Sequence, residues 1–275
     1  MENTQSLSEE NKKPWGLTES TLKIIAIVTM FIDHIGAGLL ERMMTWYGLN
    51  TVKTEEQYRN WMAAHGTLYN LDMVLRCIGR IAFPIFCFMI VEGLLHTRSR
   101  VKYAVRLFLF GIISEIPFDL MLGGKVIYWG YQNVYFTLWL GLLAIWVIDE
   151  ALKAEKLKNC HIIVKGIIIV ITVGVFGVLA ELMRTDYGSV GVLAIAVMYV
   201  FKRFINNNAN KWIFLAGCLA LMLSNFAEGF AAVAAPFVER YNGERGIKLK
   251  YLFYAFYPVH LFFIYLITRA LGFWI

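Results

Sequence analysis

The chain has 275 residues, of which 59% are hydrophobic and only 17% are charged, and its net charge is +6. Soluble domains average about half apolar and about a quarter charged residues, so this composition excludes an ordinary soluble domain. Apolar runs of about 20 residues, enough to cross a bilayer, occur several times. Because these runs are continuous and do not alternate with a two-residue period, they favour helices over barrel strands. The sequence therefore predicts an all-α, polytopic transmembrane helical bundle.

About eight spans are expected in a single membrane domain, residues 1–275, with no internal repeat. A polar segment, 1–20, precedes them; it has no apolar core or cleavage site, so we expect it to be retained and not removed as a signal peptide. The longest loop, 42–72, is rich in Trp and Tyr, which suits an interfacial helix at the lipid headgroups. The expected spans are 22–41, 73–95, 102–121, 134–150, 161–180, 189–204, 211–235 and 251–272.

The Lys and Arg residues in the short loops predict the orientation. The basic stretches 96–102, 153–165 and 201–211 fall on the side of the N-terminus, so that side is predicted to be cytoplasmic and loop 42–72 extracytoplasmic. By this count the basic segment 239–250 falls outside. Either the seventh span is a re-entrant or split element, or the rule fails locally.

Positive charge spread over short loops is typical of contact with anionic lipid headgroups, so the lipid bilayer is the first expected partner. Nucleic acid is not expected. The four cysteines have no metal or redox spacing, and no metal site is predicted; they are Cys77, Cys87, Cys160 and Cys218.

Ionisable residues lie near the middle of four expected spans. At about 1.5 Å per residue, Asp33 and His34 lie roughly 16–18 Å from the cytoplasmic face, and Arg80, Glu115 and His260 lie at a similar depth. Each such group costs roughly 2.5–3.5 kcal/mol in lipid. The layer is therefore either a set of structural ion pairs, such as Arg80 with Asp33 or Glu115, or a functional site.

Lys23 and His34 are eleven positions apart, which places them on one helix face about 16 Å apart along the axis. A cation at the cytoplasmic surface below an imidazole suits an extended donor such as acetyl-CoA, which has phosphates at one end and a thioester at the other. Simple snorkelling would also explain Lys23. Further basic residues could join Lys23 around the phosphates, namely Arg98, Arg100, Lys102 and Arg106.

His34 is the best candidate base, because a neutral imidazole can take a proton near pH 7. Asp33 points about 100° away around the helix, so we expect it to organise the site through Arg80 or His260. Glu115 is the alternative partner that would orient His34 from another span. Arg80 or His260 could also stabilise an oxyanion.

Other polar residues have structural interpretations. Pro84 should kink its span and free a carbonyl beside the polar layer. Asn133 and Thr137 could line an acceptor entrance, or they could cap a helix and bond back to it. Glu92 and Arg106, both near the cytoplasmic face, are expected to form a plain ion pair.

The chain carries four motifs in order, LKIIAIVTMFIDHIG, GRIAFPIFCFMIVEGLLHTRS, RLFLFGIISEIPFDL and NVYFTLWLGLL. Together they resemble the TraX family of bacterial membrane proteins over about residues 20–145; TraX of conjugative plasmids acetylates the pilin N-terminus. The Lys23-x10-His34 spacing also resembles the Arg/Lys-x10-His motif of the acyltransferase-3 superfamily and the related heparan α-glucosaminide acetyltransferase. This resemblance implies that His34 is catalytic, with Lys23 in the cationic position. It also implies a multi-pass protein of the bacterial cytoplasmic membrane.

The sequence thus favours a membrane acyltransferase that moves acetyl from cytoplasmic acetyl-CoA to an amine or hydroxyl. The acceptor would be a protein such as a pilin-like N-terminus, an envelope glycan or a small molecule. Direct transfer and an acetyl-histidine intermediate both stay open, and the chain could form a homodimer. The alternatives are a proton-coupled transporter, in which Asp, Glu and His form a relay, and a non-catalytic envelope assembly protein.

Overall fold

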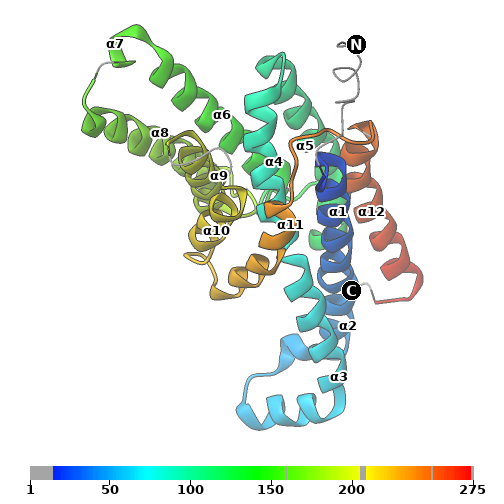
Figure 1. The fold of residues 1–275 in the computed structure, drawn as a ribbon. Helices are drawn as coiled ribbons and strands as arrows, with labels where there is room; N and C mark the ends of the chain where they lie inside the picture. Colours follow the sequence, from blue (N-terminus) through cyan, green and yellow to red (C-terminus); the bar gives the residue numbers. More distant parts are fainter. Residues whose placement is uncertain (1–14, 159, 205–208, 249, 274–275) are drawn as a thin grey trace, which may run out of the picture.

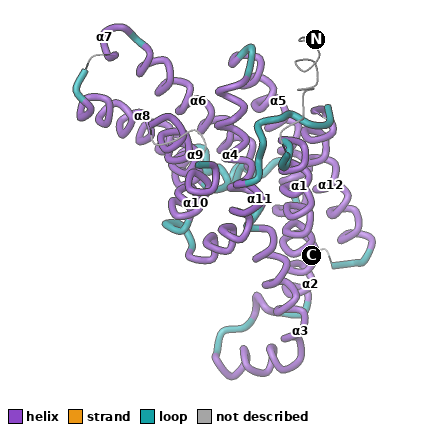
Figure 2. The backbone as a smooth tube through the Cα atoms, in the orientation of Figure 1, coloured by secondary structure: helices purple, strands orange, loops and turns teal. Residues whose placement is uncertain are grey.

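The structure is a computed structural model that describes residues 15–158, 160–204, 209–248 and 250–273. It is a bundle of helices (Figure 1). The described residues include no strand, and only two isolated bridges pair extended backbone, Leu17 with Tyr241 and Gln132 with Thr185 (Figure 2). The predicted all-α membrane bundle is confirmed. Five helical stretches in these ranges are long and apolar enough to cross a membrane, namely Glu19–Trp46, Glu55–His96, Val134–Lys153, Ile162–Leu182 and Tyr251–Ala270.

The helices follow the expected spans closely except at the second, where helix begins at Glu55 and breaks after Gly79, and at the seventh. In chain order they are α1 (Glu19–Ile35), a π-helical turn (Gly36–Leu40), α2 (Glu41–Trp46), a 3-10 turn (Leu49–Thr51), α3 (Glu55–Gly79), α4 (Ala82–His96), α5 (Arg100–Gly123), α6 (Val134–Lys153), α7 (Glu155–Lys158), α8 (Ile162–Leu182), α9 (Gly188–Phe204), α10 (Asn210–Leu221), a 3-10 stretch (Phe226–Ala234), α11 (Ala235–Glu239) and α12 (Lys250–Ala270).

The first span contains a π-helical turn directly after His34. Such single-turn π-bulges occur frequently at functional sites. Gly38 in this turn allows α12 to approach closely, because a Cβ there would lie 2.7 Å from Cγ2 of Ile264. The hydroxyl of Thr268 on α12 also donates a hydrogen bond to the carbonyl of Gly38, at 3.2 Å. The turn therefore fixes α12 against the segment that carries His34.

The second span is a long rod made of α3 and α4, broken at Arg80 and Ile81. Pro84 lies in the first turn of α4 and has no N–H for the carbonyl of Arg80, so the expected kink falls one turn before the proline. The expected loop 42–72 is largely helical, since α3 begins at Glu55 after a capping box. In Figure 1 the start of α3 extends beyond the other helices.

The seventh expected span, 211–235, is split into α10, a 3-10 stretch and α11. The loop that follows returns to the start of α1, where the N–H of Leu17 donates to the carbonyl of Arg240 at 2.7 Å (Figure 2). Farther along the same loop, the N–H of Ile247 donates to Oγ of Ser20 at 3.0 Å. The described residues 239–248 of this basic segment therefore lie at the same end of the bundle as the N-terminus of α1, and the split-element interpretation accounts for them.

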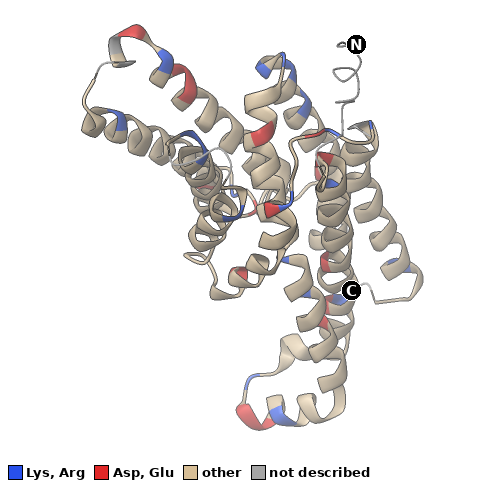
Figure 3. Cartoon of the chain, in the orientation of Figure 1, with Lys and Arg blue, Asp and Glu red and all other residues tan. Residues whose placement is uncertain are grey.

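The core joins α1, α4, α6, α9 and α12 through fully buried apolar side chains such as Phe88, Ile145 and Tyr199. By contrast, α6, α7 and α8 extend to one side as an arm (Figure 1), and α8 buries little of its apolar surface in the bundle. Charged residues gather at helix ends and loops, and the outer faces of α8 and α12 carry few of them (Figure 3). Apolar outer faces suit surroundings of lipid.

Candidate functional site

Two histidines from opposite ends of the sequence lie in direct contact. Nδ1 of His34 on α1 is 2.7 Å from Nε2 of His260 on α12, and the two ring planes are inclined by 29° with their centroids 4.9 Å apart. Nδ1 of His260 in turn lies 2.7 Å from the carbonyl oxygen of Phe256. His260 is only 4% exposed. The sequence placed both histidines in one layer, but it did not predict that they pair with each other.

Asp33 is held by Arg76 and not by Arg80 or His260. Oδ2 of Asp33 lies 2.5 Å from Nη1 of Arg76, whose Nε is 3.5 Å from Oε1 of Glu41. Asp33 therefore joins α1 to α3 through Arg76, and not through the partners expected from the sequence. Sequence reasoning missed Arg76, although it precedes Arg80 by four positions and so shares its helix face.

Arg80 forms its ion pair with Glu228 of the 3-10 stretch, at 2.9 Å, and not with Asp33 or Glu115 as expected. Glu228 is 2% exposed. It lies in the segment that replaces a regular seventh span, so a pattern-based span assignment could not place it beside α3. This ion pair joins the end of α3 to the 3-10 stretch.

Glu115 does not orient His34; its carboxylate accepts hydrogen bonds from the backbone N–H of Asn133 at 2.8 Å and from Nδ2 of Asn133 at 2.5 Å. Oδ1 of Asn133 accepts from the N–H of Tyr135 at 3.0 Å, so the helix-cap interpretation of Asn133 is confirmed. Thr137 donates to the backbone carbonyl of Asp186 and does not bond back within its own helix. These residues fix the start of α6 against α5 and the loop before α9.

The expected ion pair between Glu92 and Arg106 is wrong. Glu92 of α4 pairs instead with Lys202 of α9, and both are buried, at 4% and 8% exposed. Nζ of Lys202 also lies 5.5 Å from the ring centroid of Phe88. Because the partners are 110 positions apart, only the packing of α4 against α9 brings them together.

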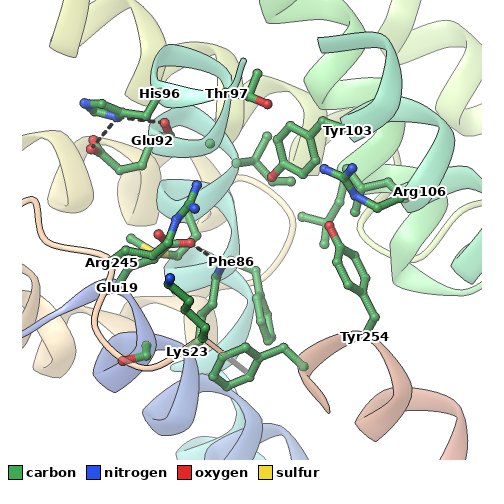
Figure 4. Close-up of a pocket in the computed structure, with 18 of the residues that line it drawn as sticks. Glu19, Lys23, Phe86, Glu92, His96, Thr97, Tyr103, Arg106, Arg245 and Tyr254 are labelled. Carbon is green, nitrogen blue, oxygen red and sulfur yellow. Dashed lines mark hydrogen bonds and ion pairs between the residues drawn. The ribbon is translucent and has the colours of Figure 1, made fainter. Parts of the chain in front are cut away.

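A cavity of about 450 Å³ opens at the end of the bundle where α1 starts, between α1, α4, α5, α12 and the loop 240–248 (Figure 4). Of the predicted phosphate-binding residues, Lys23 and Arg106 line it. Arg98, Arg100 and Lys102 do not, and Arg100 is held by Asp149 and Glu150 of α6.

The other cations of the cavity are Arg245 and Lys248, which come from a loop that the span count placed on the opposite side. Lys23 is paired with Glu19 one turn earlier and lies 5.8 Å from the ring centroid of Phe253. In Figure 4, Lys23 and Arg245 project from one wall and Arg106 from the facing wall. The cavity therefore has cations on two sides, and the carboxylates of Glu19 and Glu92 also line it.

An aromatic layer lies between the cavity and the histidine pair. Tyr135 lines the cavity, its ring centroid is 5.2 Å from that of Tyr257, and Tyr257 lies 5.8 Å from the ring of His34. The hydroxyl of Tyr135 donates to the carbonyl of Tyr254 at 3.2 Å. Pro258 has no N–H for that carbonyl, so Tyr135 satisfies the gap that the proline leaves in α12.

Two tyrosines outside the spanning helices are held in their neutral form. Burial, reinforced by Glu92 and Glu19, raises the pKa of Tyr241, whose side chain lines the cavity. Burial and the neighbouring Asp186 raise the pKa of Tyr131, which donates its hydroxyl proton to Oδ1 of Asp186 at 2.5 Å. No group of three or more His, Cys, Asp or Glu side chains in the described ranges is arranged to hold a metal ion.

The fold and this arrangement define a multi-pass helical membrane protein. It encloses a layer of ionisable side chains, and a cavity lined partly by cations opens at one end of the bundle. The family model described as TraX protein matches residues 18–268, so the chain belongs to the TraX family. The predicted resemblance to the TraX family is confirmed, and the match extends through the C-terminal half.

Among curated proteins, the chain is similar to the probable fimbrial assembly protein FimC, serogroup H1, of Dichelobacter nodosus. The two are 27% identical over 263 residues, which cover 87% of this chain and 91% of the relative. No solved structure matches the chain.

Proposed function

We propose that this TraX-family protein is a membrane acyltransferase that moves acetyl from cytoplasmic acetyl-CoA to an amine or hydroxyl of an envelope component. The observation that carries the proposal is the position of the cationic cavity relative to the histidine pair. Lys23 lines the cavity, and His34 lies eleven positions farther along the same helix face, about 16 Å away. This arrangement suits a donor with phosphates at one end and a reactive thioester at the other.

The residues of the cavity fit such a donor. Its volume of about 450 Å³ lies within the usual range of ligand sites, about 300–1,000 Å³. Lys23, Arg106 and Arg245 supply positive charge for phosphate groups. Leu138 and Phe253 also line the cavity and give it apolar wall area, which suits the uncharged arm of the donor.

In the proposed reaction, His34 takes the proton from the acceptor N–H or O–H while the acceptor atom attacks the thioester carbonyl carbon. The C–S bond then breaks, and the departing thiolate takes a proton from the His34 imidazolium. In the alternative course His34 attacks first, carries the acetyl group and passes it to the acceptor. Since Arg80 is engaged by Glu228, we assign it no oxyanion role in either course.

Two properties of this family member support an acceptor in the cell envelope. The chain is a multi-pass membrane protein of the TraX family, and a relative carries the name of a fimbrial assembly protein. We propose a pilin-like N-terminus or an envelope glycan as the acceptor. The relationship to the acyltransferase-3 group, based on the Lys23-x10-His34 spacing, belongs to this same proposal.

The test is acetyl transfer by protein reconstituted in lipid nanodiscs. Membranes from a strain that lacks the gene serve as acceptor, and label from acetyl-carbon-labelled acetyl-CoA is followed into protein, glycan and lipid fractions. We expect His34→Ala to lower transfer at least about 100-fold, the lower end of what a general base contributes. His161→Ala, at the N-cap of the outlying helix α8, is the matched control and should transfer normally. Wild-type transfer by a folded His34→Ala protein would overturn the assignment.

A proton-coupled transporter is the second candidate, and the charges of Asp33, Arg76, Arg80 and Glu228 across the layer favour it. Titration calorimetry with acetyl-CoA separates the two. Binding that weakens in Arg245→Ala supports the acyltransferase. An absence of binding at millimolar acetyl-CoA would favour the transporter, or the non-catalytic assembly protein suggested by the name of the relative.

A further inference from the structure

Two hydrogen bonds in series connect the backbone of α12 to the ring of His34. The first joins the carbonyl oxygen of Phe256 to Nδ1 of His260, and the second joins Nε2 of His260 to Nδ1 of His34; both are 2.7 Å long. Each ring nitrogen of an imidazole either carries a proton and donates a hydrogen bond, or bears a lone pair and accepts one. The series therefore determines which atoms carry protons.

The backbone carbonyl decides the first step, because a carbonyl oxygen only accepts hydrogen bonds. Nδ1 of His260 must carry a proton, and in a neutral ring Nε2 of His260 then bears a lone pair. The proton between the rings must therefore belong to Nδ1 of His34. A neutral His34 then has a bare Nε2, which is the nitrogen that points away from His260.

The opposite arrangement requires a doubly protonated His260 that donates from Nε2. That would place a positive charge on a ring that is 4% exposed, and no carboxylate contacts this ring in the described part of the chain. The rings around it are apolar or aromatic, with Phe31 at 5.9 Å and Phe256 at 4.7 Å between centroids. Burying an unpaired charge in such surroundings is strongly unfavourable.

We infer that His260 is a positioning residue that holds His34 in its Nδ1–H tautomer and presents the bare Nε2 of His34 as the basic atom. The inference rests on the proposed acyltransferase function for its catalytic meaning, although the tautomer itself does not. It also explains why α12 packs closely against the first span. Gly38 and Thr268 fix the position of α12 along α1, and this position aligns the two rings.

The first experiment reads the tautomer directly. Protein labelled with carbon-13 and nitrogen-15 in its histidines is studied by solid-state NMR in lipid, and the His34 signals are assigned by their absence in His34→Gln. We expect the Nδ1–H tautomer in the wild type. In His260→Leu the bond is lost, and we expect His34 to shift toward the Nε2–H tautomer that predominates in free imidazole side chains. The inference would be overturned if His34 is in the Nε2–H tautomer in the wild type, or if its tautomer is the same in His260→Leu as in the wild type.

The second experiment measures transfer with labelled acetyl-CoA as above. We expect His260→Leu to lower kcat at least about 100-fold while KM for acetyl-CoA changes less than about twofold, since a wrong histidine tautomer costs up to about 10⁴-fold in serine proteases. His260→Gln offers an amide oxygen to the same Nδ1–H and should restore most of kcat. A purely structural role would lower stability in both variants and would not produce this split.

The two proposals fail in different ways. If the wild type transfers no acetyl group but NMR shows the expected tautomer, the acyltransferase is refuted and the positioning role of His260 stands. If transfer depends on His34 but the Leu and Gln variants at position 260 have equal kcat, the positioning role is refuted and the acyltransferase stands. Melting curves of both variants establish that the compared proteins are folded.

Discussion

Gly79 lies directly against Asp33, where the helix that carries Asp33 packs on the helix that carries Arg76. A Cβ at position 79 would lie 2.2 Å from both Cβ and Oδ1 of Asp33, whereas ordinary contacts begin at 3.4 Å. Gly79→Ala therefore requires α1 and α3 to separate by about 1 Å or Asp33 to leave its place. Overpacking of this kind costs about 1–3 kcal/mol, and the higher helix propensity of Ala offsets at most about 1 kcal/mol of that.

The assay is thermal unfolding of the detergent-solubilised protein, followed by tryptophan fluorescence, together with acetyl transfer. A loss of 1 kcal/mol lowers Tm by about 2–4 °C in domains of roughly 200 residues, so we expect a fall of several degrees. Gly166→Ala on α8 is the matched control, because a Cβ there meets nothing within 4 Å. If Gly79→Ala melts as Gly166→Ala does, the close approach of Asp33 to α3 is wrong.

Two further changes test contacts that the structure brought together. Lys202→Met leaves the buried carboxylate of Glu92 without its cation and should destabilise the protein by about 3–5 kcal/mol. Adding Glu92→Gln to this variant should recover most of the loss in Tm. Equal Tm values of the single and double variants would contradict the ion pair. Arg245→Ala, at the cavity, should weaken acetyl-CoA binding at least about tenfold, since hydrogen bonds to charged groups contribute about 1.5–3 kcal/mol in other proteins. Arg98→Ala, outside the cavity lining, should leave binding unchanged. If calorimetry instead shows weaker binding in Arg98→Ala than in Arg245→Ala, the phosphate-binding residues expected from the sequence are correct and the cavity assignment is wrong.

The central layer shows how far spacing alone can go. Depth along a helix follows from a rise of about 1.5 Å per residue, and this placed His34 and His260 in one layer. The structure brings the two rings into direct contact, which depth alone did not predict. Which neighbour a side chain contacts depends on the rotation of its helix and on the crossing angles of the helices, and depth determines neither. For that reason depth allowed Glu115 as an alternative partner of His34, whereas the structure places it against Asn133, the N-cap of α6.

The ion pairs show the same limit. Each expected pair joined residues at matching depth on helices close in sequence, as with Glu92 and Arg106. The structure instead pairs Glu92 with Lys202 and Arg80 with Glu228, across more than a hundred residues. Hydropathy can show that a buried charge needs a partner, but only the packing of the helices selects which partner it has.

The cationic cavity illustrates the second source of error, which is topology. A regular seventh span would carry Arg245 and Lys248 to the opposite side of the membrane from Lys23. The split into α10, a 3-10 stretch and α11 returns them to the start of α1. The charge pattern signalled the conflict, because positive residues favour the cytoplasmic side.

By itself, the sequence determined that this protein is a helical membrane bundle, where its long helices lie, and that ionisable groups share one depth. It also determined the TraX family, because the four motifs are recognised from their residues and their order along the chain, without knowledge of their contacts in space. Tertiary structure alone decided that His34 meets His260, that Asp33 meets Arg76, and that Arg245 and Lys248 join Lys23 and Arg106 at one cavity. Apolar length and periodicity are local properties of a chain, whereas these contacts depend on how distant helices pack, rotate and reverse.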